Sequence, residues 1–123
     1  MYSLLVGIDV SKDLFSAAGI DSRGAESFSN SHAMDCSGFG EFLKVLRSHC
    51  EDLSKVLIGM ESTGCYHINL FSFLTSQGIR TMVVNPLLIA NFAKLSLRKT
   101  KTDKKDAMTI ARFLQDHHEE ISQ

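Results

Sequence analysis

The chain has 123 residues, of which 44% are hydrophobic and 22% charged, and its formal net charge is −1. That length suits one domain with a buried core, and the composition is ordinary for a globular protein. No apolar run reaches the roughly 18 residues of a membrane span, and the opening residues lack the basic region and cleavage site of a secretory signal. The cysteines Cys36, Cys50 and Cys65 are scattered without CxxC spacing. This favours free thiols in a reducing cytoplasm over a zinc site or a disulfide framework.

The amino-terminal part of the sequence predicts an antiparallel meander of three strands. Residues 4–10 form a continuous apolar run, as expected for a buried central strand, and residues 14–20 predict a second strand after a short polar break. Between 21 and 24, Asp at the first position and Gly at the fourth fit a type I turn. Residues 25–30 then predict a weaker third strand.

The middle of the sequence predicts a helix, a strand, a second helix and a second strand. From about Asp35 the apolar residues recur at spacings of three and four, as on one face of a helix: Phe39, Phe42, Leu43 and Leu46. Residues 55–60 return to strand character. We expect 62–64 (Ser-Thr-Gly) to cap a helix that buries Ile68, Phe71 and Leu74 and ends at Gln77-Gly78, before a strand at 80–84.

Two helices are expected in the last third. Asn85 as cap and Pro86 at the first helical position begin a helix that runs to about Leu97. After a basic linker, Thr102 is expected to cap a last helix, in which four residues share helical spacing: Ala107, Ile110, Ala111 and Leu114. The resulting order predicts an α/β fold with a mixed five-stranded sheet, in strand order 3-2-1-4-5, flanked by helices on both faces.

Two acidic residues occupy unusual positions in this pattern. Asp9 lies near the carboxyl end of the most apolar strand, where an acid is rarely found, and Glu61 directly follows another strand. In the predicted order these strands are adjacent and parallel, so both acids emerge at one edge of the sheet. Ligands of such sheets gather at the carboxyl ends of the strands.

Two further acids, Asp103 and Asp106, are three residues apart and would share one face of the last helix. Taken singly, each acid has an ordinary explanation as a helix-terminal, exposed or strand-ending residue. If the last helix crosses the edge that carries Asp9 and Glu61, four carboxylates converge and require a cation among them. Such ligands suit Mg²⁺ or Mn²⁺, and two ions could activate a nucleophile and stabilise a leaving oxygen at phosphorus.

Basic residues are concentrated before the last helix. A stretch of twelve positions begins at Lys94 and also contains Arg98, Lys99, Lys101, Lys104 and Lys105. It is either a phosphate-binding surface or a solvated basic loop. Lys12, beside the proposed acidic edge, could contact phosphate or serve only in a turn.

Four motifs in order give the chain a family resemblance: Gly7-Ile8-Asp9-Val10-Ser11-Lys12, Glu61-Ser62-Thr63-Gly64, Asn85-Pro86 and Lys101-Thr102-Asp103-Lys104-Lys105-Asp106-Ala107. The chain resembles, from about Leu5 to Phe113, the amino-terminal domain of DEDD transposases of insertion sequences, the Piv/MooV group of site-specific DNA recombinases. The resemblance implies an RNase H-like, RuvC-like domain over residues 1–118. Residues 119–123 would then be a tail leading to a carboxyl-terminal domain with a nucleophilic serine.

The same resemblance implies the chemistry and the partners. Asp9, Glu61, Asp103 and Asp106 would be the catalytic tetrad that binds Mg²⁺ or Mn²⁺, with two ions expected. Lys12 and the basic residues from Arg98 to Lys105 would bind nucleic acid. DNA, an element-encoded guide RNA and further copies of the full protein are the implied partners, at the nucleoid of a bacterial or archaeal cytoplasm.

Three other functions remain open from the residues. A sugar kinase or actin-like ATPase also opens with a strand ending in Gly-x-Asp, but its hairpin turn needs glycine to reach a nucleotide phosphate, and here the turn is Ser11-Lys12-Asp13. A RuvC-like nuclease acting on Holliday junctions would use the same acids. A DNA-positioning module would use them only to organise the fold.

Overall fold

The computed structural model describes residues 2–61, 64–95 and 106–121, with the backbone alone at 92–95, 106 and 118–121. Five strands, four α-helices and a short 3₁₀ helix follow one another in these residues. In chain order they are β1 (Leu4–Val10), β2 (Leu14–Asp21), β3 (Glu26–Ala33), α1 (Cys36–His49), η1 (Leu53–Lys55), β4 (Val56–Glu61), α2 (Ile68–Ser76), β5 (Arg80–Val84), α3 (Pro86–Leu95) and α4 (Asp106–Ile121).

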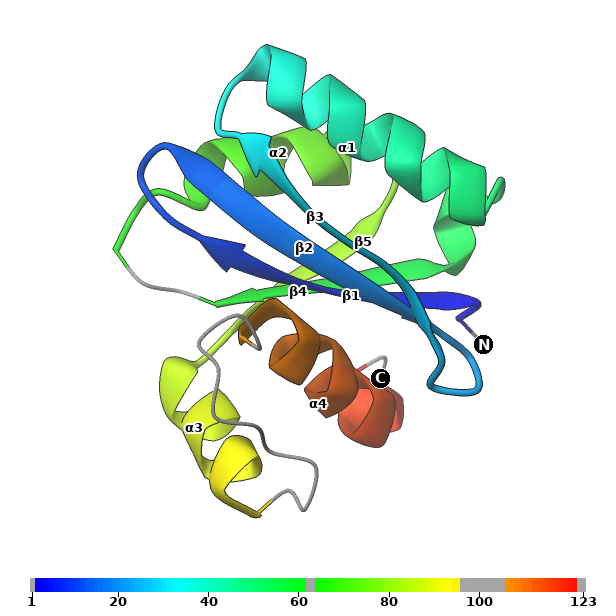
Figure 1. The fold of residues 1–123 in the computed structure, drawn as a ribbon, viewed down its shortest axis with the longest axis vertical. Coiled ribbons are helices and arrows are strands. Elements are labelled where there is room, and N and C mark those ends of the chain that lie inside the picture. The colour runs from blue at the N-terminus through cyan, green and yellow to red at the C-terminus, as the bar shows by residue number, and fades with distance from the viewer. Residues whose placement is uncertain (1, 62–63, 96–105, 122–123) are drawn as a thin grey trace.

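The strands form a mixed sheet in the order β3-β2-β1-β4-β5, as the sequence predicted (Figure 1). The β1–β2 and β2–β3 pairs are antiparallel, whereas β1–β4 and β4–β5 are parallel. Parallel neighbours need a long connection that crosses a face of the sheet, and α1 and α2 lie in those connections. The most apolar strand, β1, is the middle strand of the sheet.

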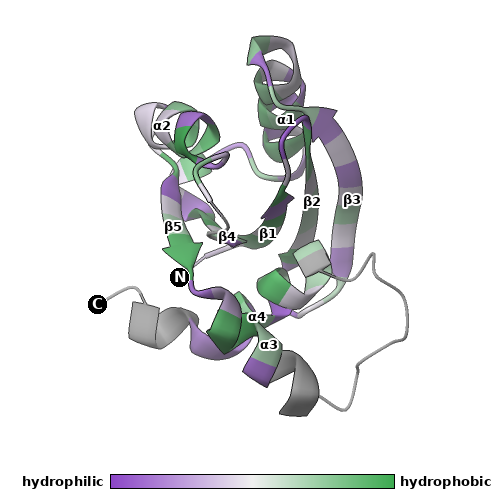
Figure 2. Cartoon of the chain, turned by 90° about the vertical axis from the view of Figure 1, so that its left-hand side faces the viewer, coloured by the Kyte–Doolittle hydropathy of each residue, from purple (hydrophilic) through white to green (hydrophobic). Residues whose placement is uncertain are grey.

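Helices cover both faces of the sheet, with α1 and α2 on one side and α3 and α4 on the other (Figures 1 and 2). Side chains alternate along a strand, so β1 contributes to two cores. Leu4, Val6, Ile8 and Val10 pack in the core shared with α1 and α2. Leu5 packs in the core shared with α3 and α4.

Two glycines let α4 approach the sheet closely. Gly7 of β1 and Gly59 of β4 are register partners, and both lie under α4. A Cβ at Gly7 would collide with the backbone O of Ala107 and lie 2.5 Å from the backbone N of Ala111. A Cβ at Gly59 would lie 3.0 Å from Cδ2 of Leu114. The backbone of α4 therefore rests directly on the backbone of β1.

The turn predicted between the second and third strands is present. Gly24 N donates to Asp21 O at 2.9 Å, and Gly24 adopts a φ of 88° that favours glycine. The Asp21 carboxylate accepts hydrogen bonds from the backbone N–H groups of Ala25 and Arg23, which lower its pKa. The strand that follows extends to Ala33, three residues beyond its predicted end at 30.

The start of the second helix differs from the prediction. The helix begins at Ile68 with His67 as its N-cap, and the side chain of His67 makes no capping hydrogen bond. Residues 64–67 form turns, and Gly64 has a φ of 69°, which is incompatible with an α-helix. Ile68, expected to be buried, is 53% exposed, while Leu70 and Leu74 provide the buried face.

The later elements follow the prediction where the structure describes them. Leu87 N donates to Asn85 Oδ1 at 2.8 Å, so Asn85 caps α3 as expected, with Pro86 first in the helix. The expected end of that helix at Leu97 and the expected cap Thr102 fall outside the described residues. The last described helix continues to Ile121, and the domain boundary expected at 118 stays a prediction. No helix in the described ranges is long and apolar enough to cross a membrane.

Candidate active site

Asp9 is the residue before the last of β1, and Glu61 is the last residue of β4, the parallel strand that is hydrogen-bonded beside it. The paired register of β1 and β4 runs to Ile8 and Met60, and each acid is the next residue of its strand. Asp9 shares a face with Leu5 and Gly7, and Glu61 shares it with Leu57 and Gly59, because side chains alternate. Both acids are half-buried. They therefore occupy neighbouring positions on the face that carries α3 and α4.

The direction of α4 brings its first residue toward the same edge. Ala107 and Ala111 lie over Gly7, whereas Arg112 Nη1 donates to Gly24 O at 3.0 Å farther along the helix. Gly24 belongs to the turn beyond the amino end of β1, where Asp21 pairs with Leu4. The helix thus runs antiparallel to β1. Its amino terminus, at Asp106, points to the edge where β1 and β4 end (Figure 1).

The rest of the predicted site is only partly within the described residues. Asp106 begins α4, but its side chain is not described, and Asp103 lies outside the described residues. The same holds for the basic residues Arg98, Lys99, Lys101, Lys104 and Lys105. Among the described side chains, no group of three or more His, Cys, Asp or Glu residues could hold a metal ion. A metal at Asp9 and Glu61 would need ligands from outside that set, and the four-acid site stays a prediction.

Lys12 is exposed at the tip of the β1–β2 hairpin. The tip is fixed by Ser11, whose backbone N and Oγ both donate to Leu14 O, at 2.9 and 2.8 Å. The Ser11 hydroxyl is thus used in the turn. Lys12 belongs to the connection that directly follows the strand carrying Asp9, at the same end of the sheet as the two acids.

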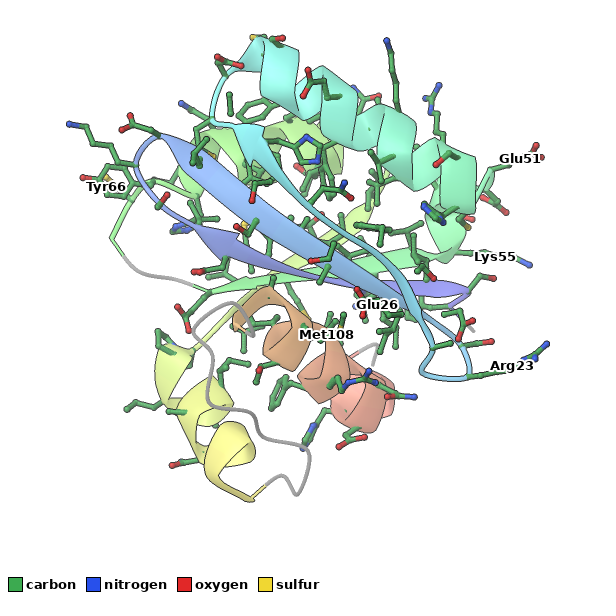
Figure 3. All side chains as sticks on the ribbon, in the orientation of Figure 1. Arg23, Glu26, Glu51, Lys55, Tyr66 and Met108 are labelled. Carbon is green, nitrogen blue, oxygen red and sulfur yellow. The ribbon has the colours of Figure 1, made fainter. Side chains whose placement is uncertain are left out.

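Exposed apolar side chains also mark this edge. The large hydrophobic residues that are exposed in the described chain lie in three places. Leu14 follows the β1–β2 connection, Tyr66 and Ile68 follow β4, and Val83, Leu87 and Leu88 lie at or after the end of β5. Figure 3 shows Tyr66 at this edge, with Arg23 and Lys55 at the opposite one. Exposed apolar side chains and the exposed Lys12 therefore lie at the end of the sheet that carries the two acids.

The sequence prediction missed a pair of serines beside Asp9. Ser16 of β2 is the register partner of Asp9, and Ser31 of β3 is the register partner of Ser16. Their Oγ atoms share a hydrogen bond of 3.1 Å. The sequence alone did not show this neighbour, because placing Ser16 opposite Asp9 requires the register that pairs Val10 with Phe15.

A family model described as transposase matches residues 6–123. The chain belongs to this family. Two pilin gene-inverting proteins, from Moraxella lacunata and Moraxella bovis, are each 32% identical to the chain over 115 residues, which are 92% of this chain and 34% of theirs. The chain thus spans about a third of the length of the curated transposase relatives that it matches.

Among solved structures, the fold resembles that of a Holliday junction resolvase from fowlpox virus. The TM-score is 0.54 at 12% sequence identity, over 98% of this transposase-family chain and 99% of the resolvase. At that identity the likeness concerns the fold alone. It confirms the predicted RNase H-like architecture, a mixed sheet in the order 3-2-1-4-5 with flanking helices.

Proposed function

We propose that this chain is the catalytic domain of a DNA transposase or site-specific recombinase, which performs metal-dependent strand cleavage and transfer when an insertion sequence moves. The observation that carries the proposal is the placement of Asp9 and Glu61 at the ends of neighbouring parallel strands, on the face where α4 begins with Asp106. Membership of the transposase family supports it. So does the share of the chain that aligns with the pilin gene-inverting proteins.

The donor chemistry of the edge suits a hard divalent cation. Asp9 and Glu61 offer carboxylate oxygens, the ligands preferred by Mg²⁺ and Mn²⁺, and such ions keep coordination positions for water and phosphate. In this proposal Asp9, Glu61, Asp103 and Asp106 would together hold the two ions. When bound, the ions supply the positive charge that activates the attacking oxygen and stabilises the leaving oxygen at phosphorus.

DNA is the proposed substrate, and basic residues are proposed to guide its backbone to the acids. Lys12 is exposed at the acidic edge, and the stretch that contains Arg98, Lys99, Lys101, Lys104 and Lys105 directly precedes α4 in the sequence. Contacts of this kind position a phosphate backbone without reading its sequence. Target choice is therefore assigned to other parts of the full protein and to a guide RNA. Because transposition needs more than one active site, we also propose that the full protein is a homo-oligomer.

Metal binding tests the acidic site directly. We expect Mg²⁺ or Mn²⁺ to bind the wild-type chain in isothermal titration calorimetry, and Asp9→Asn to weaken binding by at least about tenfold, since a shared charged ligand contributes about 1.4 kcal/mol or more. Asp13→Asn is the matched control, because Asp13 is an exposed acid in the connection after β1. Equal affinities for Asp9→Asn and wild type, with DNA absent and with DNA present, would rule out the proposed site.

The role of the basic stretch is tested by the salt dependence of DNA binding. We expect Lys99→Ala with Lys101→Ala to lower the slope of log Kd against log salt by about 2, because each neutralised phosphate contributes about 0.9. The control is Arg23→Ala with Lys55→Ala, which removes two charges at the opposite edge (Figure 3). Fluorescence anisotropy with a labelled DNA duplex gives both slopes. An unchanged slope for the first double variant would contradict the steering role.

A further inference from the structure

A row of polar residues crosses the sheet beside the proposed metal site. Ser31, Ser16 and Asp9 are successive register partners on β3, β2 and β1. Directly opposite residues of an antiparallel pair project from the same face, with Cβ atoms about 4.5–5.5 Å apart. The side chain of Ser16 therefore stands next to that of Asp9, on the face that carries α4. On the other side of Asp9, the end of β4 contributes Glu61 to the same face.

The hydrogen bond between the two serines leaves one hydroxyl proton for a ligand. A serine hydroxyl donates once and accepts twice. With Ser31 donating across the 3.1 Å contact, the proton of Ser16 is free to point toward an acceptor above the sheet. Ser16 is half-buried, whereas Ser31 is exposed. The row is thus accessible from the Ser31 side, and its inner hydroxyl lies nearest to the acids.

We infer that Ser16, oriented by Ser31, binds the nucleic-acid backbone next to Asp9 by donating a hydrogen bond to a phosphate oxygen. The inference rests on the proposed function, because it assumes that a phosphodiester is presented to Asp9 and Glu61. Serine hydroxyls commonly contact phosphates, and such contacts set the position of the strand. A neutral donor suits this place, because it anchors the backbone without adding a cation that would compete with metal ions for the carboxylates.

A purely structural role for the two serines predicts a different result. Cross-strand serine pairs also stabilise a sheet by a fraction of a kcal/mol to about 1 kcal/mol. If that were the only role, replacing Ser16 would lower the melting temperature and leave DNA binding by the folded protein unchanged. A backbone-binding role requires weaker DNA binding by a protein that remains folded.

The test compares four variants of the full-length protein with wild type. Ser16→Ala removes the proposed donor, Ser16→Thr keeps a hydroxyl, and Ser31→Ala removes only the orienting partner. Ser29→Ala is the matched control. Ser29 is an exposed serine of β3, like Ser31, but it pairs with Ala18 and not with the serine opposite Asp9. The Kd of a labelled DNA duplex, KM and kcat for its cleavage in Mg²⁺, and the melting temperature are measured for each.

We expect Ser16→Ala to raise Kd and KM about tenfold, as for loss of a hydrogen bond to a charged group, with kcat changed less than about twofold. Ser31→Ala should raise both by about threefold, and Ser16→Thr and Ser29→Ala should stay within about twofold of wild type. Unchanged Kd and KM for Ser16→Ala would overturn the inference, as would equal effects of Ser16→Ala and Ser29→Ala. Failure of the wild type to cleave DNA in Mg²⁺ would count against the proposed function, while the Kd series would still decide the role of Ser16.

Discussion

The two faces of the sheet are built from the same strands but differ in what their side chains do. On the face covered by α1 and α2, β1 presents Leu4, Val6, Ile8 and Val10, all buried. On the face covered by α4, the intervening residues of β1 are Leu5, Gly7 and Asp9. The first face thus fills a core with large apolar side chains. On the second face, the large side chain of Leu5 is followed by Gly7, which has none, and then by the charged side chain of Asp9.

The difference shows how one strand can serve both stability and a site. The apolar face buries aromatic rings, with Phe15 and Phe42 in edge-to-face contact at 5.3 Å between ring centroids. The other face places glycine where α4 crosses, so the helix backbone comes close to the strand and its first residue reaches the acidic edge. Substitutions on the first face should therefore change stability, and substitutions on the second face should change the site.

The largest expected effect on stability is on the α1/α2 face. Phe42 is fully buried among aromatic rings, so Phe42→Ala should lower the free energy of unfolding by about 3–5 kcal/mol through lost apolar contacts and a cavity. Urea denaturation followed by circular dichroism measures this. The metal affinity of the remaining folded protein should match wild type. A loss of less than about 1 kcal/mol would contradict the assignment of this face as the main source of stability.

A smaller loss of stability, accompanied by a change at the site, is expected for Gly7→Ala. The added methyl group meets backbone atoms of α4, which cannot move aside alone, so the helix must shift at a cost of about 1–3 kcal/mol. Gly59→Ala is the control, because its methyl group meets the flexible end of Leu114. Urea denaturation and metal titration are compared for both. Equal losses in the two variants would show that α4 is not seated through Gly7.

The smallest expected effect has the opposite sign. His32 is buried against Phe15 and Phe42, and its Nε2 has no hydrogen-bond partner in the described part of the chain. Its Nδ1 lies 3.5 Å from Glu41 Oε1. Replacing a buried polar group by an apolar one of similar size removes the cost of that unsatisfied nitrogen, so His32→Leu should raise the free energy of unfolding by about 1 kcal/mol. A lower free energy in urea denaturation would mean that the imidazole contributes a needed contact.

Much of the fold followed from local signals in the sequence. The apolar run of β1, the Asp-to-Gly turn at 21–24 and the Asn85-Pro86 helix start each have a physical cause that acts over a few residues, and each is present in the structure. The strand order followed because a meander followed by crossover helices admits few arrangements. These features depend little on distant parts of the chain.

The prediction was wrong where tertiary contacts or turn geometry decide. Ser62-Thr63-Gly64 has the composition of a helix cap, and Ser62 and Thr63 lie outside the described residues. Gly64 has a left-handed conformation that an α-helix does not contain, and α2 begins only at Ile68. The end of β3 contains Ser-Asn-Ser-His, which has weak strand propensity. Pairing with β2 holds it in the sheet as far as Ala33, opposite Leu14.

For the proposed site, the sequence predicted where Asp9 and Glu61 lie in the sheet, but it did not predict which residues lie beside them. Asp9 and Glu61 could be placed at one edge because parallel strands end together, and the structure puts them on neighbouring strands. Ser16 was overlooked because a lone serine in a strand carries no signal until its register partner is known. The assignment of the four acids, of Lys12 and of the basic residues from Arg98 to Lys105 as site residues stays a prediction.

The seating of α4 on β1 also has a consequence for biosynthesis. β1 is synthesised well before α4, yet the two pack directly against each other through Gly7. A nascent or prematurely ended chain that lacks α4 therefore carries Asp9 and Glu61 without the helix that begins at Asp106. The acid set proposed above can therefore come together only after α4 has been synthesised.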